Sequence, residues 1–508
     1  MTSPPADGVT DPSPRDHGVN GSNSRFDFTT EIPAAGSLGS VHFIAIGGAG
    51  MSGVARVMLA RGMSVSGSDA RESLVLTALA AEGAEVHIGH DASYLTGADT
   101  VVISSAIRED NVELRAARAR GLRVLHRSQA LASVMRGSRR VAVAGTNGKT
   151  TTTSMLTVAL QACGVDPSFA VGGELAKHGT NAHLGTGDIF VAEADESDGS
   201  FLVYRPDVAI VTSVQPDHLD FYGTFAAVQA AYAAFAATVQ PKGLLVACAD
   251  DPGSRELADL AAAAGTRVVT YGLAADADVR LTALDGAGFH GRADLVRAGV
   301  VLGRLGIGMP GRHNLLNATA AFVAATEGLA QDPVRVLEGL AGFTGTRRRF
   351  EPKGEVAGVR VVDDYAHNPG KVAAVVETAR GLAAPGRLVV VFQPHLYSRT
   401  RDFAAELADA LSPADLVIVM DVYAAREDPM PGVSGALIAN QLDAAQAPRD
   451  HIRFVPFWSD VAPLVAQIAR SGDLVLTVGA GDVTMIGPEI LRLLGQRPDA
   501  TEAVQGQE

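Results

Sequence analysis

The sequence predicts an α/β protein of three domains: a Rossmann-like domain at the N-terminus, a central domain that resembles a P-loop ATPase, and a second Rossmann-like domain at the C-terminus. Its 508 residues suit about three cores, at roughly 150 residues each. Short apolar strands alternate with helical patterns, which predicts parallel sheets. Several strands end in glycines or ionisable residues, as at the ligand sites of such sheets. We expect a disordered tail over 1–38 and domains over 39–136, 137–342 and 343–508.

Composition narrows the function classes. Two cysteines, Cys163 and Cys248, are too few for a disulfide framework and suit a reducing compartment. Residues 1–40 lack the pattern of a signal peptide, and no apolar stretch reaches the ~18 residues that span a bilayer. The 42 Lys and Arg against 56 Asp and Glu give a formal charge of −14, which argues against nucleic acid as a general partner. We therefore expect a cytoplasmic protein that binds neither nucleic acid nor membranes.

A glycine fingerprint follows the first predicted strand, residues 41–46. A helical pattern comes next over 54–61, and a second strand over 64–68 ends on Asp69, where such folds place the partner of a ribose. The fingerprint G-x-G-x-x-G consists of Gly48, Gly50 and Gly53. These glycines indicate a pyrophosphate close to the backbone, usually that of a nicotinamide cofactor, but they do not name the nucleoside. A glycine-rich turn without a ligand is the alternative.

A phosphate-binding loop opens the central domain. The apolar strand over 141–144 runs into G-T-N-G-K-T-T, and the threonines lead into a helical pattern. Backbone N–H groups at the helix start favour anionic oxygens, Lys149 can reach the terminal phosphates, and the Thr150 hydroxyl can ligate Mg2+. The general P-loop has glycine where this chain has Val143, so only its second half is matched. An ordinary corner between a strand and a helix is the alternative.

Acidic side chains follow two strands of the central domain. The strand over 188–193 ends in E-A-D-E-S-D, and the next one is followed by D-H-L-D. Carboxylates at the carboxyl ends of strands, in one domain with a phosphate loop, fit a Mg2+ site, for which histidine is a less usual ligand. We expect Glu193 to bind the metal. For Asp198 we expect a solvated loop, and for Asp217 a helix cap.

Candidate polar groups lie in the central domain's last long helix and in a basic triplet that follows it. This helix is predicted over 311–329, and its Asn314 and Asn317 share one face. Asparagine near a helix start is more often a cap than a ligand. The basic triplet over 347–349 could be solvated surface or could supply an arginine to a phosphoryl group.

Three strand ends of the C-terminal domain carry ionisable residues, and they make one rim of its sheet. They cover 361–369, 388–401 and 474–482. Because ligands of parallel sheets bind at this edge, the rim predicts a second ligand site, facing the phosphate loop.

Taken together, these motifs resemble the Mur ligases. The resemblance covers nearly the whole chain, from about Val41 to Arg492. It rests on A-I-G-G-A-G-M-S, G-T-N-G-K-T-T-T-T, E-A-D-E-S-D, D-H-L-D, H-N-x-x-N-A, R-R-F, D-D-Y-A-H and Q-P-H-x-Y-S-R-T, in this order. It implies a ligase of peptidoglycan precursor synthesis that uses ATP and Mg2+ to join L-alanine to UDP-N-acetylmuramate, and that is a monomer or a weak homodimer.

The resemblance also implies roles for individual residues. The catalytic residues would be Lys149, Glu193, His218 and Arg349, and the metal would lie at Thr150, Glu193 and His218. ATP would contact Gly145, Thr146, Asn147, Gly148, Lys149, Thr150, Thr151, Asn314, Asn317 and Asp364. The UDP substrate would contact Gly47, Gly48, Gly50, Met51, Ser52, Asp69, Ser104 and Ser105. The amino-acid pocket would contain His367, His395, Tyr397 and Arg399.

Four positions depart from the family's pattern. Ala45 stands where the first motif usually has glycine. Asn147 and Asn368 stand where members of the alanine-adding branch often have histidine. Leu396 stands where the family often has an arginine directly after the histidine. The last departure bears on the amino-acid pocket. Three alternatives stay open: a sister ligase for another amino acid or a peptide, a nicotinamide oxidoreductase fused to an ATPase, and a non-catalytic UDP-sugar sensor.

Overall fold

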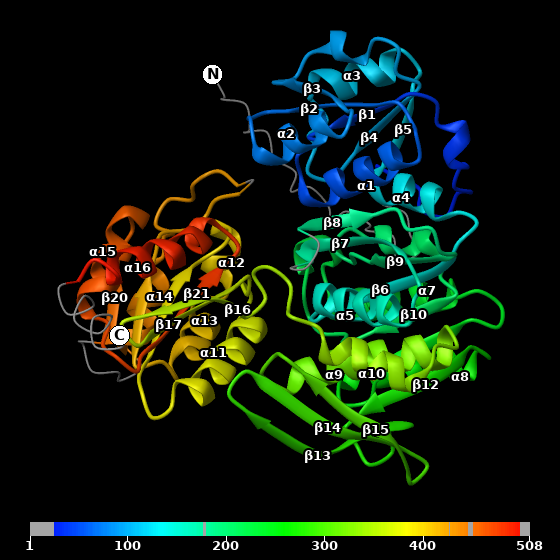
Figure 1. Ribbon diagram of the computed structural model, residues 1–508. Coiled ribbons are helices and arrows are strands. Elements are labelled where there is room, and N and C mark those ends of the chain that lie inside the picture. The colour runs from blue at the N-terminus through cyan, green and yellow to red at the C-terminus, as the bar shows by residue number, and fades with distance from the viewer. Residues whose placement is uncertain (1–24, 176–178, 426, 445–450, 498–508) are drawn as a thin grey trace, which may run out of the picture. The chain divides into compact units, whose positions relative to one another are not determined.

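The structure is a computed structural model that describes residues 25–175, 179–425, 427–444 and 451–497. The chain divides into two compact units, and Figure 1 labels the helices and strands along it. The first contains Met1–Thr146 and Asp188–Thr270, and the second contains Asn147–Gly187 and Tyr271–Glu508. The phosphate loop lies where the chain passes from one unit to the other. Within the described ranges, no helix has the length and apolar character needed to cross a membrane.

A five-stranded parallel sheet forms the N-terminal part of the first unit, in the order β3-β2-β1-β4-β5. Its strands are β1 (Val41–Ile44), β2 (Val65–Asp69), β3 (Glu85–Ile88), β4 (Thr100–Ile103) and β5 (Arg123–His126). Its helices are η1 (Ala35–Ser37), α1 (Ala49–Ala60), α2 (Leu74–Ala81), η2 (Ala92–Leu95), α3 (Val112–Ala119) and α4 (Arg127–Met135). Every residue of β1 and β4 is buried, as in strands covered on both faces.

Four parallel strands complete the first unit, in the order β9-β6-β10-β11. They are β6 (Arg139–Ala144), β9 (Ile189–Glu193), β10 (Val208–Val211) and β11 (Leu244–Cys248). The helices between them are η3 (Ser200–Tyr204), α6 (Leu219–Tyr222), α7 (Phe225–Ala237) and α8 (Pro252–Ala263), and β12 (Arg267–Gly272) follows. Because β6, β9 and β10 run in parallel, their carboxyl ends meet at one edge, where the phosphate loop and both acidic motifs begin.

The second unit begins with α5 (Lys149–Ala162) and the antiparallel pair β7 (Ser168–Leu175) and β8 (Thr180–His183). An antiparallel meander follows, with β13 (Val279–Ala287), β14 (His290–Arg297) and β15 (Val300–Ile307). The predicted helix over 311–329 is α9 (Arg312–Val323) continued by a π-helical segment, Ala324–Gly328, and α10 (Pro333–Ala341) comes next. Helix α5 packs against α9 and α10 (Figure 1).

A six-stranded sheet carries the rest of the second unit, in the order β16-β17-β21-β18-β19-β20. The strands are β16 (Glu351–Val356), β17 (Val359–Asp364), β18 (Leu388–Gln393), β19 (Leu416–Val419), β20 (Ile452–Phe454) and β21 (Leu474–Gly479). The helices are α11 (Pro369–Ala383), α12 (Tyr397–Asp402), α13 (Ala404–Leu411), α14 (Ala436–Ala444), α15 (Trp458–Ile468), η6 (Asp482–Met485) and α16 (Ile486–Leu494). All pairings are parallel except β16 with β17.

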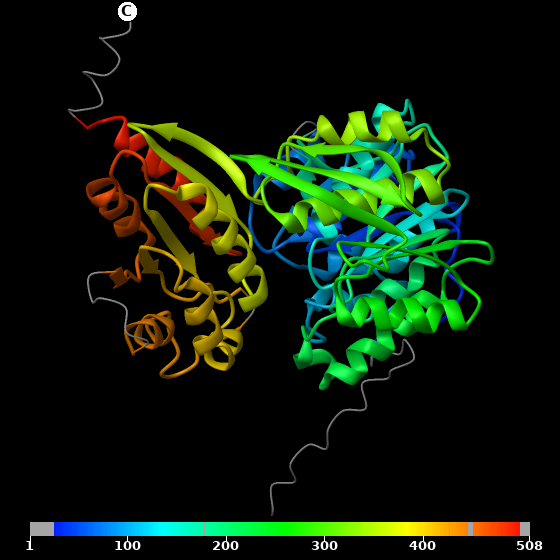
Figure 2. The ribbon, with the colours of Figure 1, turned by 90° about the horizontal axis from the view of Figure 1, so that it is seen from below.

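Alternation along β18 shows how this sheet is buried. Leu388, Val390 and Phe392 join the core under α11, α13 and α14, whereas Val389 and Val391 join the core under α15 and α16. Figure 2 shows helices on both faces of the sheet. The structure contains three sheets, of five, ten and six strands, which agrees with the predicted α/β class and its Rossmann-like outer domains. The domain limits stay predictions.

Two expectations about the chain's irregular segments are wrong. The tail predicted over 1–38 is packed from residue 25 onward, because Phe28 and Leu38 are buried and the Asp27 carbonyl accepts a bond of 3.1 Å from Gln129. Residues 1–24 lie outside the described ranges. The sequence also predicts a linker over 131–140, but this segment consists of the end of α4 at Met135, a turn of three residues and the start of β6 at Arg139.

Candidate active site

The glycine fingerprint lies at the start of α1, which begins at Ala49 and not at the predicted residue 54, so Gly50 and Gly53 are part of the helix. Gly48 is the N-cap, no side chain caps the helix, and the N-terminal N–H groups of a 12-residue helix suit an anion. The Gly47 N–H donates to Asp69 Oδ2 at 3.0 Å, so Asp69 shapes the loop. A Cβ at Gly50 would lie 3.0 Å from the Arg127 guanidinium. The small residues therefore let a cation approach the same helix end.

Arg127 is a candidate site residue that the sequence analysis missed. It is the first residue of α4, directly after β5, and its Nη2 donates to Asp195 Oδ2 at 2.6 Å. Burial lowers the pKa of Arg127, but the charges of the Asp195 and Asp198 carboxylates raise it by more than burial lowers it. The pKa of Arg127 is therefore above its ordinary value. An arginine at the carboxyl end of a strand was the available signal. Its permanent charge beside α1 suits a diphosphate.

Asp198 belongs to a buried network, and the expectation of a solvated loop is wrong. It is paired with His126 Nε2 at 3.2 Å and accepts a hydrogen bond from the Ser105 hydroxyl. Burial raises the pKa of Asp198, but the hydrogen bond and charge of His126 hold it well below the usual range. The rings of Phe26 and Phe28 pack edge-on against the His126 ring, with their centres 5.1 and 5.4 Å from its centre. The predicted substrate residue Ser105 is thus joined to the acidic motif.

The first half of the phosphate loop is held by the strand beside it. Gly145 has φ +133°, and a Cβ there would lie 2.0 Å from Thr212 Oγ1. The Thr146 N–H donates to Ser213 O at 2.9 Å, and the Gln215 N–H donates to Thr146 Oγ1 at 2.9 Å. Val143, where the general P-loop has glycine, is fully buried within β6. This position is core strand, so the shorter loop needs no glycine here.

The second half of the loop meets α9. Gly148, the N-cap of α5, has φ +82°, and a Cβ there would lie 2.4 Å from Asn317 Oδ1. The alternative that Asn314 is a cap is wrong, because the N-cap of α9 is Gly311 and Asn314 Nδ2 donates to Pro310 O at 2.7 Å. Asn317 Nδ2 reaches Asn314 Oδ1 at 3.5 Å. Asn317 therefore borders the loop, and Asn314 lies beside Asn317 on the same helix.

Gly148→Ala is expected to destabilise the protein more than Gly164→Ala, which serves as the matched control. Gly164 has a similar φ of +80° after α5 but open space around its Cα. The left-handed conformation costs alanine about 1–2 kcal/mol at either position. At Gly148 the contact with Asn317 should add roughly 1–3 kcal/mol. Urea unfolding of both variants measures the difference, and equal losses would contradict the close approach.

His218 lies among carboxylates at the start of α6. It has φ +54°, and its Nε2 lies 3.8 Å from Glu196 Oε1 and 4.0 Å from Asp217 Oδ2. The expectation that Asp217 caps the helix is wrong, since His218 is the N-cap residue and Asp217 accepts from its N–H at 2.9 Å. Glu193 ends β9 next to Val143 of β6. The pairing of Glu193 with His218 at a metal stays a prediction.

The three arginines of the basic triplet have three different environments. Arg347 is 61% exposed and pairs with Glu174 at 2.8 Å. Arg348 donates to the carbonyls of Gly479 and Gly481 at 2.7 and 3.2 Å. Arg349 Nη2 donates to Thr150 Oγ1 at 3.2 Å, and its guanidinium lies 5.1 Å from the centre of the Tyr365 ring. Only Arg349 therefore meets the phosphate loop.

Asp364 holds the backbone around Arg349. Its carboxylate accepts from the N–H of Phe350 at 2.8 Å and from that of Ala366 at 2.7 Å. Burial raises the pKa of Asp364, and the nearby Arg349 partly offsets this shift. Phe350 follows Arg349 directly, so the bond fixes where the arginine leaves the chain. The observed role of Asp364 is thus to position Arg349, and its contact with ATP stays a prediction.

The polar rim of the six-stranded sheet brings histidines together. The His367 and His395 rings lie 5.4 Å apart, and His395 stacks on Tyr423 at 6.1 Å. Burial, reinforced by the charges of Lys371 and Arg399, lowers the pKa of His367 well below its ordinary value. With Nδ1 2.9 Å from the Tyr365 carbonyl, a neutral His367 donates from Nδ1 and leaves Nε2 as an acceptor. Such an acceptor suits an ammonium group.

Tyr423 is a second residue of this rim that the sequence analysis missed. Tyr397 and Arg399 lie on α12, and their part in an amino-acid pocket stays a prediction. The Tyr423 N–H donates to the Pro394 carbonyl at 2.8 Å, and the Tyr423 carbonyl accepts from Leu396 at 3.0 Å. A Cβ at Gly481 would lie 2.6 Å from the Tyr423 ring, so glycine is required there. The tyrosine lies 30 positions after Gln393 in the sequence and joins its strand end only in the folded sheet.

The stability of the protein should depend on pH through His313 of α9. Burial lowers the pKa of His313 from 6.5 to about 4. The unfolded chain binds this proton first as the pH falls, so stability is complete above pH 6.5 and declines toward pH 4, by up to about 1.4 kcal/mol per pH unit. His313→Gln should reduce this decline. Urea unfolding at pH 7.5 and 5.0 tests the prediction, and equal pH dependence in both proteins would refute it.

Comparisons with known proteins agree with this arrangement. Three family models match the chain: "Mur ligase family, catalytic domain" over 40–139, "Mur ligase middle domain" over 143–325, and "Mur ligase, glutamate ligase domain" over 348–481. A UDP-N-acetylmuramate–L-alanine ligase of Kineococcus radiotolerans is 57% identical over 469 residues, 92% of this chain and 98% of that protein. A UDP-N-acetylmuramate–L-alanine ligase of Acidothermus cellulolyticus is 54% identical over 91% of this chain and 96% of that protein. The crystal structure of a UDP-N-acetylmuramate-alanine ligase from Thermotoga maritima matches with a TM-score of 0.75 and 28% identity, over 92% and 100%.

Proposed function

The chain belongs to the Mur ligase family, and from this premise we propose that it joins L-alanine to the lactyl carboxylate of UDP-N-acetylmuramate at the cost of ATP. The observation that carries the proposal is the match of 57% identity along nearly the full length of a ligase of this name. The product is a precursor of peptidoglycan. We expect the enzyme to work in the cytoplasm, as a monomer or a weak homodimer.

The phosphate loop is the ATP site of this proposal. The N–H groups at the start of α5 and the Lys149 ammonium would hold the terminal phosphates, and the buried Asn314 and Asn317 would border the nucleotide. Arg349 supports this assignment, because it donates to a hydroxyl on the first turn of α5. The helix end at Gly48, with Arg127 beside Gly50, would hold the diphosphate of UDP-N-acetylmuramate.

The reaction needs no protein nucleophile. A lactyl carboxylate oxygen attacks the γ-phosphorus of ATP, the bond to the ADP oxygen breaks, and an acyl phosphate forms. The L-alanine amine then attacks the acyl carbon, inorganic phosphate leaves with the electron pair of the C–O bond, and the amine proton passes to solvent. Lys149 and Arg349 act by positioning the phosphates and by stabilising the negative charge that develops on them.

The donor chemistry of the residues that the family resemblance assigns to the metal suits a Mg2+ ion. Thr150 and Glu193 offer the oxygen donors that Mg2+ prefers, and this ion usually keeps waters and phosphate oxygens as its other ligands. Among the described residues, no group of three or more His, Cys, Asp or Glu side chains could hold a metal ion. Bound there, Mg2+ would neutralise phosphate charge. His218, which the family resemblance also assigns to the metal, lies 3.8 Å from Glu196 and 4.0 Å from Asp217.

The amino acid would bind at the rim made by His367, His395 and Tyr423. To test the proposal, purified protein is supplied with ATP, Mg2+ and UDP-N-acetylmuramate, the amino acid is varied, and the product is identified by mass. L-alanine should give UDP-N-acetylmuramoyl-L-alanine with one ADP per product. A product with another amino acid or a peptide would identify a sister ligase. ATP binding without ADP release would indicate a sensor, and binding of a reduced nicotinamide would favour the oxidoreductase.

A further inference from the structure

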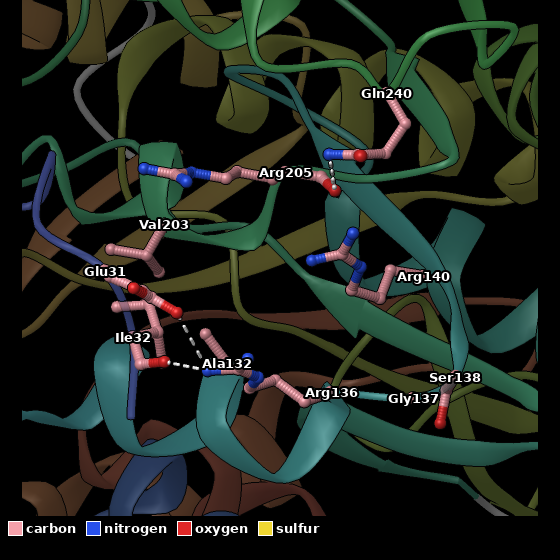
Figure 3. Close-up of a pocket in the computed structure, with 10 residues that line it drawn as sticks. All are labelled: Glu31, Ile32, Ala132, Arg136, Gly137, Ser138, Arg140, Val203, Arg205 and Gln240. Carbon is pink, nitrogen blue, oxygen red and sulfur yellow. Dashed lines mark hydrogen bonds and ion pairs between the residues drawn. The ribbon is translucent and has the colours of Figure 1, made fainter. Parts of the chain in front are cut away.

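A cavity of about 330 Å3 lies in the first unit, and none of its lining residues belongs to the motifs described above (Figure 3). It is formed where the segment before η1, the end of α4, the start of β6 and the end of η3 come together. The lining residues are Glu31, Ile32, Ala132, Arg136, Gly137, Ser138, Arg140, Val203, Arg205 and Gln240. Its volume is at the lower end of the range of small-molecule sites, about 300–1,000 Å3.

Three arginines on different walls dominate the chemistry of this cavity (Figure 3). Arg205 Nη2 donates to the Thr29 carbonyl at 3.0 Å, and Arg140 Nε lies 3.9 Å from Asp207, beyond hydrogen-bonding distance. Arg136 donates to the Ile32 carbonyl and lies 3.6 Å from the carboxylate of Glu31. A guanidinium has five N–H donors, so these contacts engage only part of the donors that the three side chains provide.

The local charge is opposite to that of the whole protein. The lining contributes three positive charges and one negative charge, whereas the chain carries a formal charge of −14. Glu31 is 86% exposed at its side chain and can move aside into solvent. The C-terminal end of α4 opposes an anion here, but its Val134 carbonyl already accepts from Arg61 and the Met135 carbonyl from Ser138. The cavity is therefore a basic hollow on an acidic protein.

The rest of the lining indicates what kind of anion fits. Ile32, Ala132 and Val203 give the cavity an apolar part, and Val203 is buried. A carboxylate offers two oxygens to three guanidiniums, whereas a phosphate monoester offers three and up to two negative charges. The planar fork of arginine matches phosphate oxygens in pairs. The apolar side chains can contact the group that the phosphate is attached to.

We propose that this cavity is a second binding site, separate from the ligase site, for a small phosphate monoester that carries an apolar or aromatic group. Arg140 and Arg205 bind the phosphate, Arg136 completes the positive field, and the apolar side chains contact the organic group. The proposal does not depend on the ligase activity, because none of these residues has a role in it. The proposal gives a function to residues 136–140. These residues form the turn between α4 and β6 and the first two positions of β6.

Titration calorimetry with phenyl phosphate tests the proposal on the full-length protein. Wild type should bind one equivalent at this site, and Arg140→Gln/Arg205→Gln should bind at least tenfold more weakly, since each lost charge-assisted bond costs about tenfold or more. The matched control is Arg118→Gln/Arg492→Gln, which removes the same charge from two exposed arginines that pair with Glu109 and Glu489. Its affinity should stay within twofold of wild type. Benzoate should bind more weakly than phenyl phosphate, and benzyl alcohol should not compete.

Three results would overturn the proposal. Absence of saturable binding to wild type would remove the site. Equal affinity in the Arg140/Arg205 variant, with its thermal midpoint preserved, would place the binding elsewhere, for example at the phosphate loop. Tighter binding of benzoate or benzyl alcohol than of phenyl phosphate would refute the assignment of a phosphate monoester.

Discussion

Lys149→Ala is expected to lower kcat at least ten- to a hundredfold. A charge-assisted hydrogen bond is worth about 1.5–3 kcal/mol, and each 1.4 kcal/mol of lost transition-state stabilisation is a tenfold loss in rate. Lys149 is the first residue of α5, directly after the left-handed Gly148, so the lysine belongs to the helix end where phosphate oxygens would bind. Phosphate release in the presence of UDP-N-acetylmuramate and L-alanine measures the effect. Lys149→Arg should recover only part of the rate, because the planar fork cannot occupy the place of a compact ammonium.

The control for Lys149→Ala is the other substrate. UDP-N-acetylmuramate would bind at the start of α1, which belongs to the first unit, whereas Lys149 belongs to the second. Calorimetry with this substrate should therefore give the same dissociation constant for variant and wild type. Near-normal turnover in the variant would show that the loop does not hold the nucleotide. Loss of binding of both substrates would indicate that Lys149→Ala is misfolded. The same measurements would then be made on Lys149→Met, which keeps most of the side-chain volume.

The short motifs could be located from the sequence because they occur at junctions between a strand and a helix. β6 is a short run of small and β-branched residues, and the glycines after it mark the turn to α5 whatever the rest of the chain does. The same logic located Glu193 at the end of β9 and the glycine fingerprint after the first strand, although α1 begins at Ala49, five residues earlier than predicted. These positions depend on local pattern alone, so hydrophobic periodicity and turn residues suffice to predict them.

Contacts between distant segments could not be predicted in this way. Asp198 and His126 are 72 positions apart, and only the fold shows that the acidic motif is buried against α4 rather than solvated. The Pro, Gly, Ser and Asp content of the first forty residues predicts a tail, but Phe28 and Leu38 are buried in the core. Tyr423 joins the histidine rim through backbone pairing with Pro394 and Leu396. Composition carries no information about such tertiary partners.

The basic triplet offers the sharpest test of the site, because its three arginines are adjacent in sequence and differ in environment. Arg349→Ala is expected to lower kcat roughly ten- to a hundredfold, for the same electrostatic reason as at Lys149. Arg347→Ala is the matched control and should stay within twofold, because its exposed pair with Glu174 is worth at most about 1 kcal/mol. Both variants remove one positive charge within three residues, so any difference between them comes from position.

Arg348→Ala should fail in a different way. Its guanidinium donates to the carbonyls of Gly479 and Gly481 and lies 4.8 Å from the centre of the Tyr365 ring, so its loss leaves carbonyls at the end of β21 without these donors. We expect its thermal midpoint to fall while that of Arg349→Ala stays near wild type. Measuring kcat and the thermal midpoint for all three variants separates positioning of phosphate from packing. If Arg347→Ala and Arg349→Ala lost activity equally, the contact of Arg349 with Thr150 would have no part in the reaction, and the triplet would be a general basic surface.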